Sequence, residues 1–484
     1  MSDEKLSWGQ MPESLMGRIG GLLESSDLYN LSVTSKDNIQ ILGLAEKDIF
    51  LSKDLSTKYL EDNDYRKKID SVLDSRNTKL HLDLSDSDSS EFRTLPINKL
   101  AGINLSSNYK MYISKNLEEI QPESLQILKL CDCFELREFP DLRKFTNLVE
   151  LDLSDNENMT TPRNVMELLP RSLQILKLCK CQLLKFPDLS MLVNLVEFTS
   201  YSSNNIAIPE NMGELLPKSL QKLVWSPVPI VNNIMTVPNL IMFEDLIELG
   251  LSGGGFEEIT FPENIGDLLP TNLQKLEIRH CVVTAFPDLR MFGKLLELDF
   301  NDGTSVNIPV NLGELLPKNL QVLKFEDCEG TIFPNLSMLD KLVELDLSCS
   351  NEMTFNVHLG LGLGKLLPTS LEKLFLKNSL GVFPDLSSLN KLVELDLSWN
   401  YHMFVHNQIQ KRLPMNLKKL NLGNCELRIF PNLSMLDKLE ELRVDLRRHD
   451  HIDPEKVIEK LPLNRKWGMR KIDFFYIIEY TIHK

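Results

Sequence analysis

The sequence predicts an α/β solenoid, in which short repeated units stack side by side along one axis. A segment that reads Pro-Glu-Ser-Leu-Gln-Ile-Leu-Lys-Leu from Pro122 recurs almost unchanged from Pro170. Related segments begin at Pro217, Pro270, Pro317, Pro368 and Pro414. Each period holds a second unit of the kind Leu-Val-Glu-Leu-Asp-Leu-Ser-Asp-Asn, which first ends at Asn156. This doubled period across much of a 484-residue chain predicts one long stack of units, not several separate globular cores.

Both kinds of unit follow the pattern L-x-x-L-x-L-x-x-N/C, in which the first leucine is position one. The alternation of leucine with polar residues predicts a short strand with one face inward, and such strands stack in parallel about 4.8 Å apart. Position nine should turn the chain inward, where a small side chain can hydrogen-bond the neighbouring backbone. It is occupied by Cys133, Asn156, Cys181, Cys281, Cys328, Asn400 and Cys425. We expect these cysteines to pack in the interior without binding metal, and Cys131 and Cys179 at position seven to be surface thiols.

The two kinds of unit differ in the segment that follows the strand. In one kind, a stretch such as Phe261-Pro-Glu-Asn-Ile-Gly-Asp-Leu-Leu-Pro270 has a proline at each end and predicts a short helical segment. In the other kind, the shorter Phe-Pro-Asp-Leu link leaves room for a turn or a 3₁₀ segment. The alternation of these two links explains why the period is doubled.

From about residue 100 to residue 446 the chain resembles the leucine-rich repeat family, and its cysteine-bearing position nine is similar to that of the intracellular subtypes. The resemblance implies a curved horseshoe with a parallel sheet on its concave side, which usually binds protein. We expect the repeats to span residues 76–446 in about 14–16 units. Residues 51–75 are expected to form a linker or N-terminal cap, and residues 447–484 a C-terminal cap.

Residues 1–50 resemble an F-box, a short helical segment that docks on the adaptor subunit of a cullin–RING ubiquitin ligase. The motif has a Pro-x-x-Leu start, an Ile four residues later and an Asp-Leu pair. The adaptor-binding residues that the resemblance implies are Pro12, Leu15, Ile19, Leu28 and Leu31. The alternative is that these short amphipathic helices form a cap on the first repeat, because they cannot bury their apolar faces alone.

Positions three, five, seven and eight are expected to point outward from the concave sheet. Position three is glutamate in every Phe-Pro-led unit and often lysine in the alternate units, so neighbouring strands should form Lys–Glu pairs. The same pairing is expected at position five, for Lys129 with Asp152 and for Lys324 with Asp346. Three aromatic residues at outward positions, Tyr201, Phe375 and Trp399, are the predicted protein-binding residues, with Lys377 and Asp396 as a polar rim. Trp225 is at an inward position and is expected in the core.

Several functional classes are disfavoured by composition. The 69 acidic and 53 basic residues give a formal charge of −16, which disfavours nucleic acid or an anionic membrane as the partner. The start of the chain has no apolar signal region and no apolar run is long enough to span a membrane, so we expect a cytoplasmic or nuclear protein. Gly360–Leu366 lacks the spacing and the Ser/Thr of a phosphate loop, and His449-Asp-His451 is expected to be a solvated turn without metal.

The sequence therefore predicts a binding protein, with no enzymatic activity and no cofactor. The favoured function is the substrate-recognition subunit of a cullin–RING ubiquitin ligase, a monomer within the larger complex. It would hold a protein substrate on its concave face. The alternative is a leucine-rich repeat scaffold or sensor that binds protein without any link to a ligase.

Overall fold

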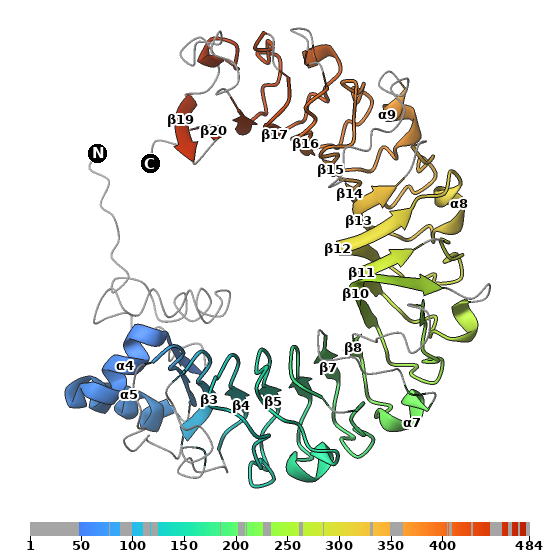
Figure 1. Ribbon diagram of the computed structural model, residues 1–484. Coiled ribbons are helices and arrows are strands. Elements are labelled where there is room, and N and C mark those ends of the chain that lie inside the picture. Colours follow the sequence, from blue (N-terminus) through green and yellow to red (C-terminus); the bar gives the residue numbers. More distant parts are fainter. Residues whose placement is uncertain are drawn as a thin grey trace. The chain divides into compact units, whose positions relative to one another are not determined.

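The computed structural model describes residues 48–76, 78–87, 99–109, 117, 124–183, 185–201, 209, 211–225, 234–260, 265–283, 285–329, 333–348, 362–403, 405, 409–426, 429–445, 457–462, 467–472 and 475–480. The chain divides into two compact parts, residues 1–206 with 214–220 and residues 207–213 with 221–484. We call these parts the first unit and the second unit; elsewhere a unit is a single repeat. In each unit the strands lie side by side on the concave side, and short helices and turns lie on the opposite side (Figure 1). The predicted α/β solenoid with a parallel sheet is confirmed.

The sheet of the first unit begins earlier than residue 76. Its strands are β1 (Ile49–Leu51), β2 (Leu80–Asp83), β3 (Leu100–Asn104), β4 (Ile127–Lys129), β5 (Glu150–Asp152), β6 (Ile175–Lys177) and β7 (Glu197–Ser200), each parallel to the next. Residues 51–75, expected as a linker or cap, contain α4 (Lys53–Glu61) and most of α5 (Asn63–Arg76). Tyr59, Ile69 and Leu73 of these helices are buried. The segment thus supplies apolar surface to the start of the stack.

The second unit contains the remaining strands. They are β8 (Lys222–Trp225), β9 (Ile234–Thr236), β10 (Glu248–Thr260), β11 (Lys275–Val283), β12 (Glu297–Asn307), β13 (Val322–Glu329), β14 (Glu344–Asp346), β15 (Lys373–Phe375), β16 (Glu394–Asp396), β17 (Lys419–Leu422), β18 (Glu441–Val444), β19 (Trp467–Ile472) and β20 (Phe475–Tyr480). The strands from β8 to β18 pair in parallel, but β20 pairs antiparallel with β18 and β19. This reversal falls within residues 447–484, the expected C-terminal cap, and it covers one edge of the parallel sheet.

The core is a set of leucine columns, because positions one, four and six of every unit point into the stack. Leu148, Leu151 and Leu153 in one unit, like Leu173 and Leu176 in the next, are fully buried. Each such side chain contributes roughly 1.5–3 kcal/mol of hydrophobic free energy on burial. Trp225 is also buried, as predicted. The alternation of the repeat therefore fixes which side of each strand faces the interior.

Position nine links each unit to the one before it, as expected from its side chains. The amide Nδ2 of Asn156 donates to the carbonyl oxygens of Leu130 and Leu153 at 2.7 and 2.6 Å, and its Oδ1 accepts from the backbone N–H of Cys133. Where the residue is cysteine, as at Cys181, the thiol donates to the Leu153 carbonyl of the preceding unit at 3.1 Å. Cys133, Cys181 and Cys425 are buried, as predicted. The side chains of Cys281 and Cys328 lie outside the described part.

The proline-bounded segments form the predicted short helices. They are η4 (Val165–Leu168), α7 (Met212–Leu215), η5 (Ile265–Asp267), α8 (Leu312–Leu315), α9 (Leu363–Leu366) and η7 (Ile409–Lys411). The carbonyl at the end of α9, on Leu366, accepts a hydrogen bond from the backbone N–H of Leu336 at 2.8 Å. Gly313 in α8 allows close packing, because a Cβ there would come within 2.3 Å of the Asn335 carbonyl oxygen. The prediction of alternating helical and turn links is confirmed.

Strands β10 to β13 are longer than the short strands that the repeat predicts. In β2, β3, β5, β14, β16 and β17 the position-five side chain accepts a hydrogen bond from the backbone N–H of position seven, as Asp152 does from Ser154 at 3.0 Å. This bond turns the chain at the end of the strand. In β10, β11 and β13, position five is Gly250, Glu277 or Lys324, none of which is a short acceptor of this kind. Lys129 in β4, Lys177 in β6 and Phe375 in β15 also lack such an acceptor although their strands are short, and β12 is long although it has Asp299, so position five alone does not set the strand length.

Among the described residues, no helix has both the length and the apolar character that crossing a lipid bilayer requires.

Replacement of Asn156 tests the importance of position nine. Asn156→Ala removes two buried donor bonds and one acceptor bond, so it should lower the free energy of unfolding by about 2 kcal/mol. Asn156→Cys keeps a donor for the Leu130 carbonyl, as cysteine does in neighbouring units, and should lose about half as much. Urea unfolding followed by circular dichroism measures both values. Equal losses for the two variants would show that the link between units does not depend on this side chain.

Candidate functional site

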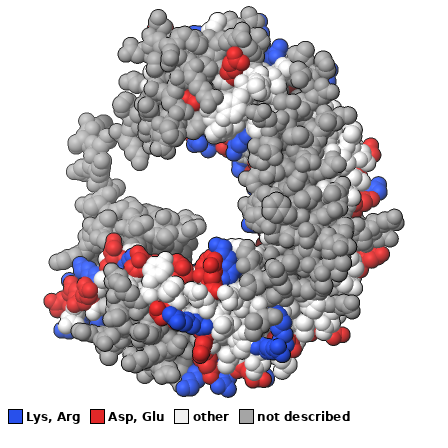
Figure 2. Space-filling view, viewed as in Figure 1, with Lys and Arg blue, Asp and Glu red and all other residues white. Residues whose placement is uncertain are grey.

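The exposed face of the sheet carries rows of paired charges that run across the strands. At position three, the Lys275 ammonium lies 2.9 Å from Glu297, and Lys373 lies 2.9 Å from Glu344. The Lys222 ammonium lies 3.5 Å from Glu248. The predicted Lys–Glu pairing is therefore confirmed at position three. In the view of Figure 2, basic and acidic side chains lie interspersed over the described residues.

The expected pairs at position five do not form, although the residues are neighbours in the sheet. The Lys129 ammonium lies 3.4 Å from Glu150, and Lys324 lies 3.1 Å from Glu344. Both lysines reach diagonally to the longer glutamate at position three. Asp152 and Asp346 instead bind the backbone N–H of position seven in their own units. The turn at the end of the strand thus uses the carboxylate that was expected to pair with lysine.

Position seven is mostly buried, which corrects the expectation that it points outward. Ser154, Ser252, Ser348 and Ser398 are each less than one-tenth exposed. The hydroxyl oxygen of Ser348, for example, accepts a hydrogen bond from the backbone N–H of Lys377 in the next unit. Cys179 is also buried, so its prediction as a surface thiol is wrong, and Cys131 is half-buried. Burial raises the pKa of the Cys131 thiol to about 12, so neither thiol is poised for reactivity.

Position eight adopts a left-handed backbone conformation in eight units. The residues are Asp86, Ser107, Asp132, Asp155, Lys180, Asn378, Trp399 and Asn424. Aspartate and asparagine tolerate this conformation because their short polar side chains bond locally. Trp399 has a φ of 64° and is 45% exposed. It is the one bulky aromatic residue among these eight.

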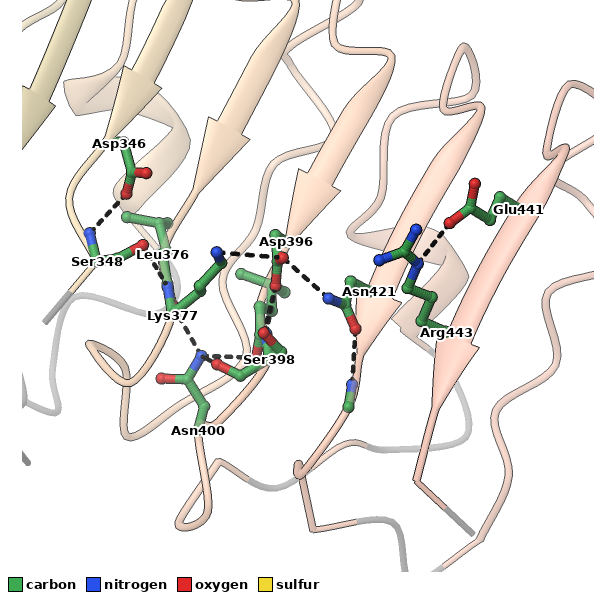
Figure 3. Close-up of polar contacts among 12 residues, drawn as sticks. Asp346, Ser348, Leu376, Lys377, Asp396, Ser398, Asn400, Asn421, Glu441 and Arg443 are labelled. Atoms are coloured by element: carbon green, nitrogen blue, oxygen red, sulfur yellow. Dashed lines mark hydrogen bonds and ion pairs between the residues drawn. The ribbon is translucent and has the colours of Figure 1, made fainter. Parts of the chain in front are cut away.

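Three of the predicted site residues lie together: Phe375 on β15, Lys377 in the turn after β15, and Asp396 on β16. Figure 3 shows the Lys377 side chain directed toward Asp396. The Lys377 ammonium lies 3.9 Å from Asp396 and 5.9 Å from the centre of the half-buried Phe375 ring. Asp396 also accepts hydrogen bonds from the Ser398 hydroxyl at 2.6 Å and from the Asn421 amide at 2.9 Å. Asp396 is therefore held in one position by neighbours from three units. We call Phe375, Lys377 and Asp396 the β15–β16 patch.

The structure does not bring the Trp399 and Phe375 rings into contact. The Trp399 ring instead meets the Tyr401 ring edge-on, with the ring centres 5.8 Å apart. Tyr201 belongs to the first unit, where it is 38% exposed and hydrogen-bonds the Cys179 thiol. The predicted adaptor-binding residues are Pro12, Leu15, Ile19, Leu28 and Leu31, and all of them lie outside the described residues.

Sequence reasoning missed a shallow hollow beside the β15–β16 patch. It has a volume of about 70 Å³ and is lined on its polar sides by Glu394, Asp396, Lys419, Asn421, Glu441 and Arg443. In Figure 3, Arg443 and Glu441 pair on β18, and Asn421 points toward Asp396. These residues occupy positions three and five of consecutive units. The repeat pattern in the sequence assigns these positions for β17 and β18 as well, so these residues could have been predicted to line the same face.

An acidic cluster lies on β11 and β12, where carboxylate oxygens of Glu277, Glu297 and Asp299 lie within 4.8 Å of one another. Burial, together with the charge of the neighbouring Glu277, raises the pKa of Asp299 to about 6. Burial also opposes ionisation of Glu277, but Lys275 and Arg279 hold its pKa below the ordinary value. These two cations partly neutralise the negative charge of the cluster.

Removal of the Asp299 charge should stabilise the protein in a pH-dependent way. Because its folded pKa is raised, ionised Asp299 opposes folding, and this cost grows as the pH rises from about 4 through 6. Asp299→Asn should therefore be more stable than the native protein at pH 7.5 by about 1 kcal/mol, after allowance for screening by solvent. Near pH 4.5 the difference should fall to about a third of this value, because Asp299 is then largely protonated in the folded state. Thermal unfolding at both pH values decides this, and an equal gain at pH 4.5 would contradict the assignment.

Comparisons with known proteins agree with this architecture. No protein-family model matches the chain, and no curated protein matches it. A leucine-rich repeat protein of Leptospira interrogans is similar in structure, with a TM-score of 0.51 and 23% identity over 76% of this chain and 90% of that chain. TLR13 in its complex with ssRNA13 gives a TM-score of 0.49 at 19% identity, over 84% of this chain and 69% of that one. An internalin of Listeria monocytogenes gives 0.42 at 16% identity, over 81% and 96%. The first of these likenesses shows the fold, and the chain has the leucine-rich repeat fold.

Proposed function

We propose that this chain is a protein-binding leucine-rich repeat receptor and that a protein partner contacts Trp399 and the β15–β16 patch of the second unit. The observation that carries the proposal is the conformation of Trp399. A bulky side chain with φ of 64° is in a backbone region that costs roughly 1–2 kcal/mol for most residues. Nearly half of the residue stays exposed, so burial in the fold recovers only part of this cost. Backbone strain that folding offsets only in part favours a functional role.

The surroundings of Trp399 fit a protein interface. Tryptophan is enriched among the residues that dominate binding energy, especially beside polar groups that exclude water. The neighbouring Phe375, Lys377 and Asp396 supply one apolar ring and one charged pair within the patch. The flanking units have Asn378 and Asn424 at the equivalent position, so they offer no competing apolar group there. A partner can therefore bury the Trp399 ring at a defined place on the turn.

Trp399→Asn tests this proposal without loss of the turn. Asparagine is the residue that both flanking units use at position eight, so the melting temperature should stay equal or rise. Capture of the partner should fall by about thirtyfold or more, which corresponds to loss of ~2 kcal/mol of binding free energy. Partners are identified by quantitative affinity capture from a eukaryotic lysate, with native protein, Trp399→Asn and Phe375→Ala in parallel.

Met435→Ala is the matched control, because Met435 is an exposed apolar residue in the link between β17 and β18 and is not part of the β15–β16 patch. A partner that binds at the proposed surface should be retained by Met435→Ala and lost by Trp399→Asn. Retention of every captured protein by Trp399→Asn would contradict the site. A large fall in melting temperature for Trp399→Asn would instead show that the ring is packed for folding.

We further propose that this receptor serves a cullin–RING ubiquitin ligase, with residues 1–50 docked on the adaptor subunit. The support for this role is the F-box-like spacing of Pro12, Leu15, Ile19, Leu28 and Leu31. In this role the chain is a single copy within the ligase, in the cytoplasm or nucleus. The competing function is a scaffold or sensor that uses the same concave surface and has no adaptor.

The combined change Leu15→Asp and Ile19→Asp separates these two functions. Both residues lie on one face of the expected helix, and two charges there cannot enter an apolar interface without a large desolvation cost. Binding to the purified adaptor subunit should be abolished, while the melting of the repeats should stay nearly unchanged. If the first repeats unfold in this variant, the segment is a cap on the solenoid. If the native chain does not bind the adaptor, the scaffold function is favoured.

A further inference from the structure

The first unit contains a hollow on the exposed face of its sheet, at strands β1 to β4. Position three of these strands carries Phe50, His81, Gly102 and Ile127, so the row of side chains is interrupted at Gly102. The hollow has a volume of about 170 Å³. Besides these four residues, Asp83, Asn104 and Lys129 at position five line it. It is larger than the hollow of the second unit and has both an aromatic and a charged side.

The aromatic side is held in place by three contacts. The Phe50 and His81 rings stack with centres 4.1 Å apart and planes within 12° of parallel. The His81 Nε2 lies 3.0 Å from an Asp48 carboxylate oxygen. The ring also lies over Gly102, since a Cβ on that residue would come within 2.1 Å of its Nδ1. Burial lowers the pKa of His81 despite Asp48, so at neutral pH this side of the hollow is an uncharged ring stack.

The charged side contains a carboxylate with an unused oxygen. The Oδ1 atom of Asp83 accepts hydrogen bonds from the Ser85 backbone N–H at 3.0 Å and from the Asn104 amide at 3.1 Å. Within the described residues, its Oδ2 atom has no hydrogen bond and no ion pair. The two nearby lysines have other partners, because Lys129 pairs with Glu150 at 3.4 Å and Lys53 with Asp86 at 2.8 Å. Among the described residues, Asp83 is therefore a fixed negative charge of the hollow with no ion-pair partner, although Lys53 lies near enough to interact with it electrostatically.

We propose that this hollow binds an arginine side chain of a protein partner, with the guanidinium stacked beside the Phe50–His81 rings and bonded to Asp83. This inference rests on the proposed function, since it assumes that the exposed face of the sheet binds protein. A guanidinium is planar, stacks on aromatic rings and matches a carboxylate with directed N–H bonds. An ammonium group cannot stack in this way. An apolar side chain would bury the Asp83 charge without a partner, which is unfavourable.

Direct binding of a small probe tests the hollow without a known partner. The probe is the blocked tripeptide acetyl-Gly-Arg-Gly-amide, and the matched probe has citrulline, which has a similar shape but no charge. A third probe has lysine. Titration of the full chain, followed by saturation-transfer NMR, should show the arginine peptide binding at least about tenfold more tightly than the other two. Equal affinities for the arginine and citrulline peptides would overturn the proposal.

Asp83→Asn is the decisive variant, because asparagine already performs the turn-forming role at position five. Asn104 and Asn421 each accept the position-seven N–H of their own units, so the turn should survive. Asp83→Asn should reduce arginine-peptide binding to the citrulline level. Asp152→Asn makes the same change three strands away, outside the hollow, and should bind like the native chain. Equal losses in both variants would mean that general charge, not the hollow, attracts the peptide.

Gly102→Ala and Trp399→Asn complete the test. Gly102→Ala should displace the His81 ring and weaken the arginine peptide, while a second melting curve confirms that the sheet is intact. Native binding in a folded Gly102→Ala chain would contradict the role of the ring stack. Trp399→Asn lies in the other unit and should leave peptide binding unchanged. Failure of the arginine site is thus measured separately from failure of the Trp399 surface.

Discussion

The interaction on which this structure depends is the hydrogen bond from position nine of one unit to the backbone of the unit before it. Each strand ends in a turn, and the carbonyl groups at that turn would be buried without partners if the interior side chain were apolar. Asn156 satisfies two such carbonyls and one N–H, and Cys181 satisfies one carbonyl with its thiol. Because each bond joins neighbours, the leucine columns can continue from unit to unit without a central core.

The turn after each strand determines which side chains are available for function. In several units an aspartate or asparagine at position five accepts a hydrogen bond from the N–H of position seven. Position seven is buried both with this bond, as at Ser154, and without it, as at Cys179. Position eight takes the left-handed conformation and projects at the rim of the sheet. The repeat therefore offers position three on the face and position eight on the rim as variable sites. Trp399 lies at the rim, and the hollow forms on the face where Gly102 has no side chain at position three.

Charges on the exposed face are arranged so that most of them are satisfied within the chain. Glu344 contacts both Lys324 and Lys373, and such exposed pairs contribute little to stability. Their main effect is to prevent the sheet, which has many acidic residues, from having a uniformly negative surface. Against this balanced background, two groups stand out among the described residues: the Oδ2 oxygen of Asp83, which has no hydrogen bond there, and the Trp399 ring, of which nearly half is exposed.

The sequence by itself determined the parallel solenoid, the buried position nine, the alternating helical links and the Lys–Glu pairs at position three. Each follows from the period within one unit or from the register of two neighbours. Tertiary structure alone decided the burial of Cys179 and Ser154, the diagonal pairing of Lys129, the long strands β10 to β13, and the hollow between Phe50, His81 and Ile127. These features depend on how side chains from three or more strands compete for the same space and the same hydrogen-bond partners. The spacing of residues within one repeat does not determine the outcome of that competition.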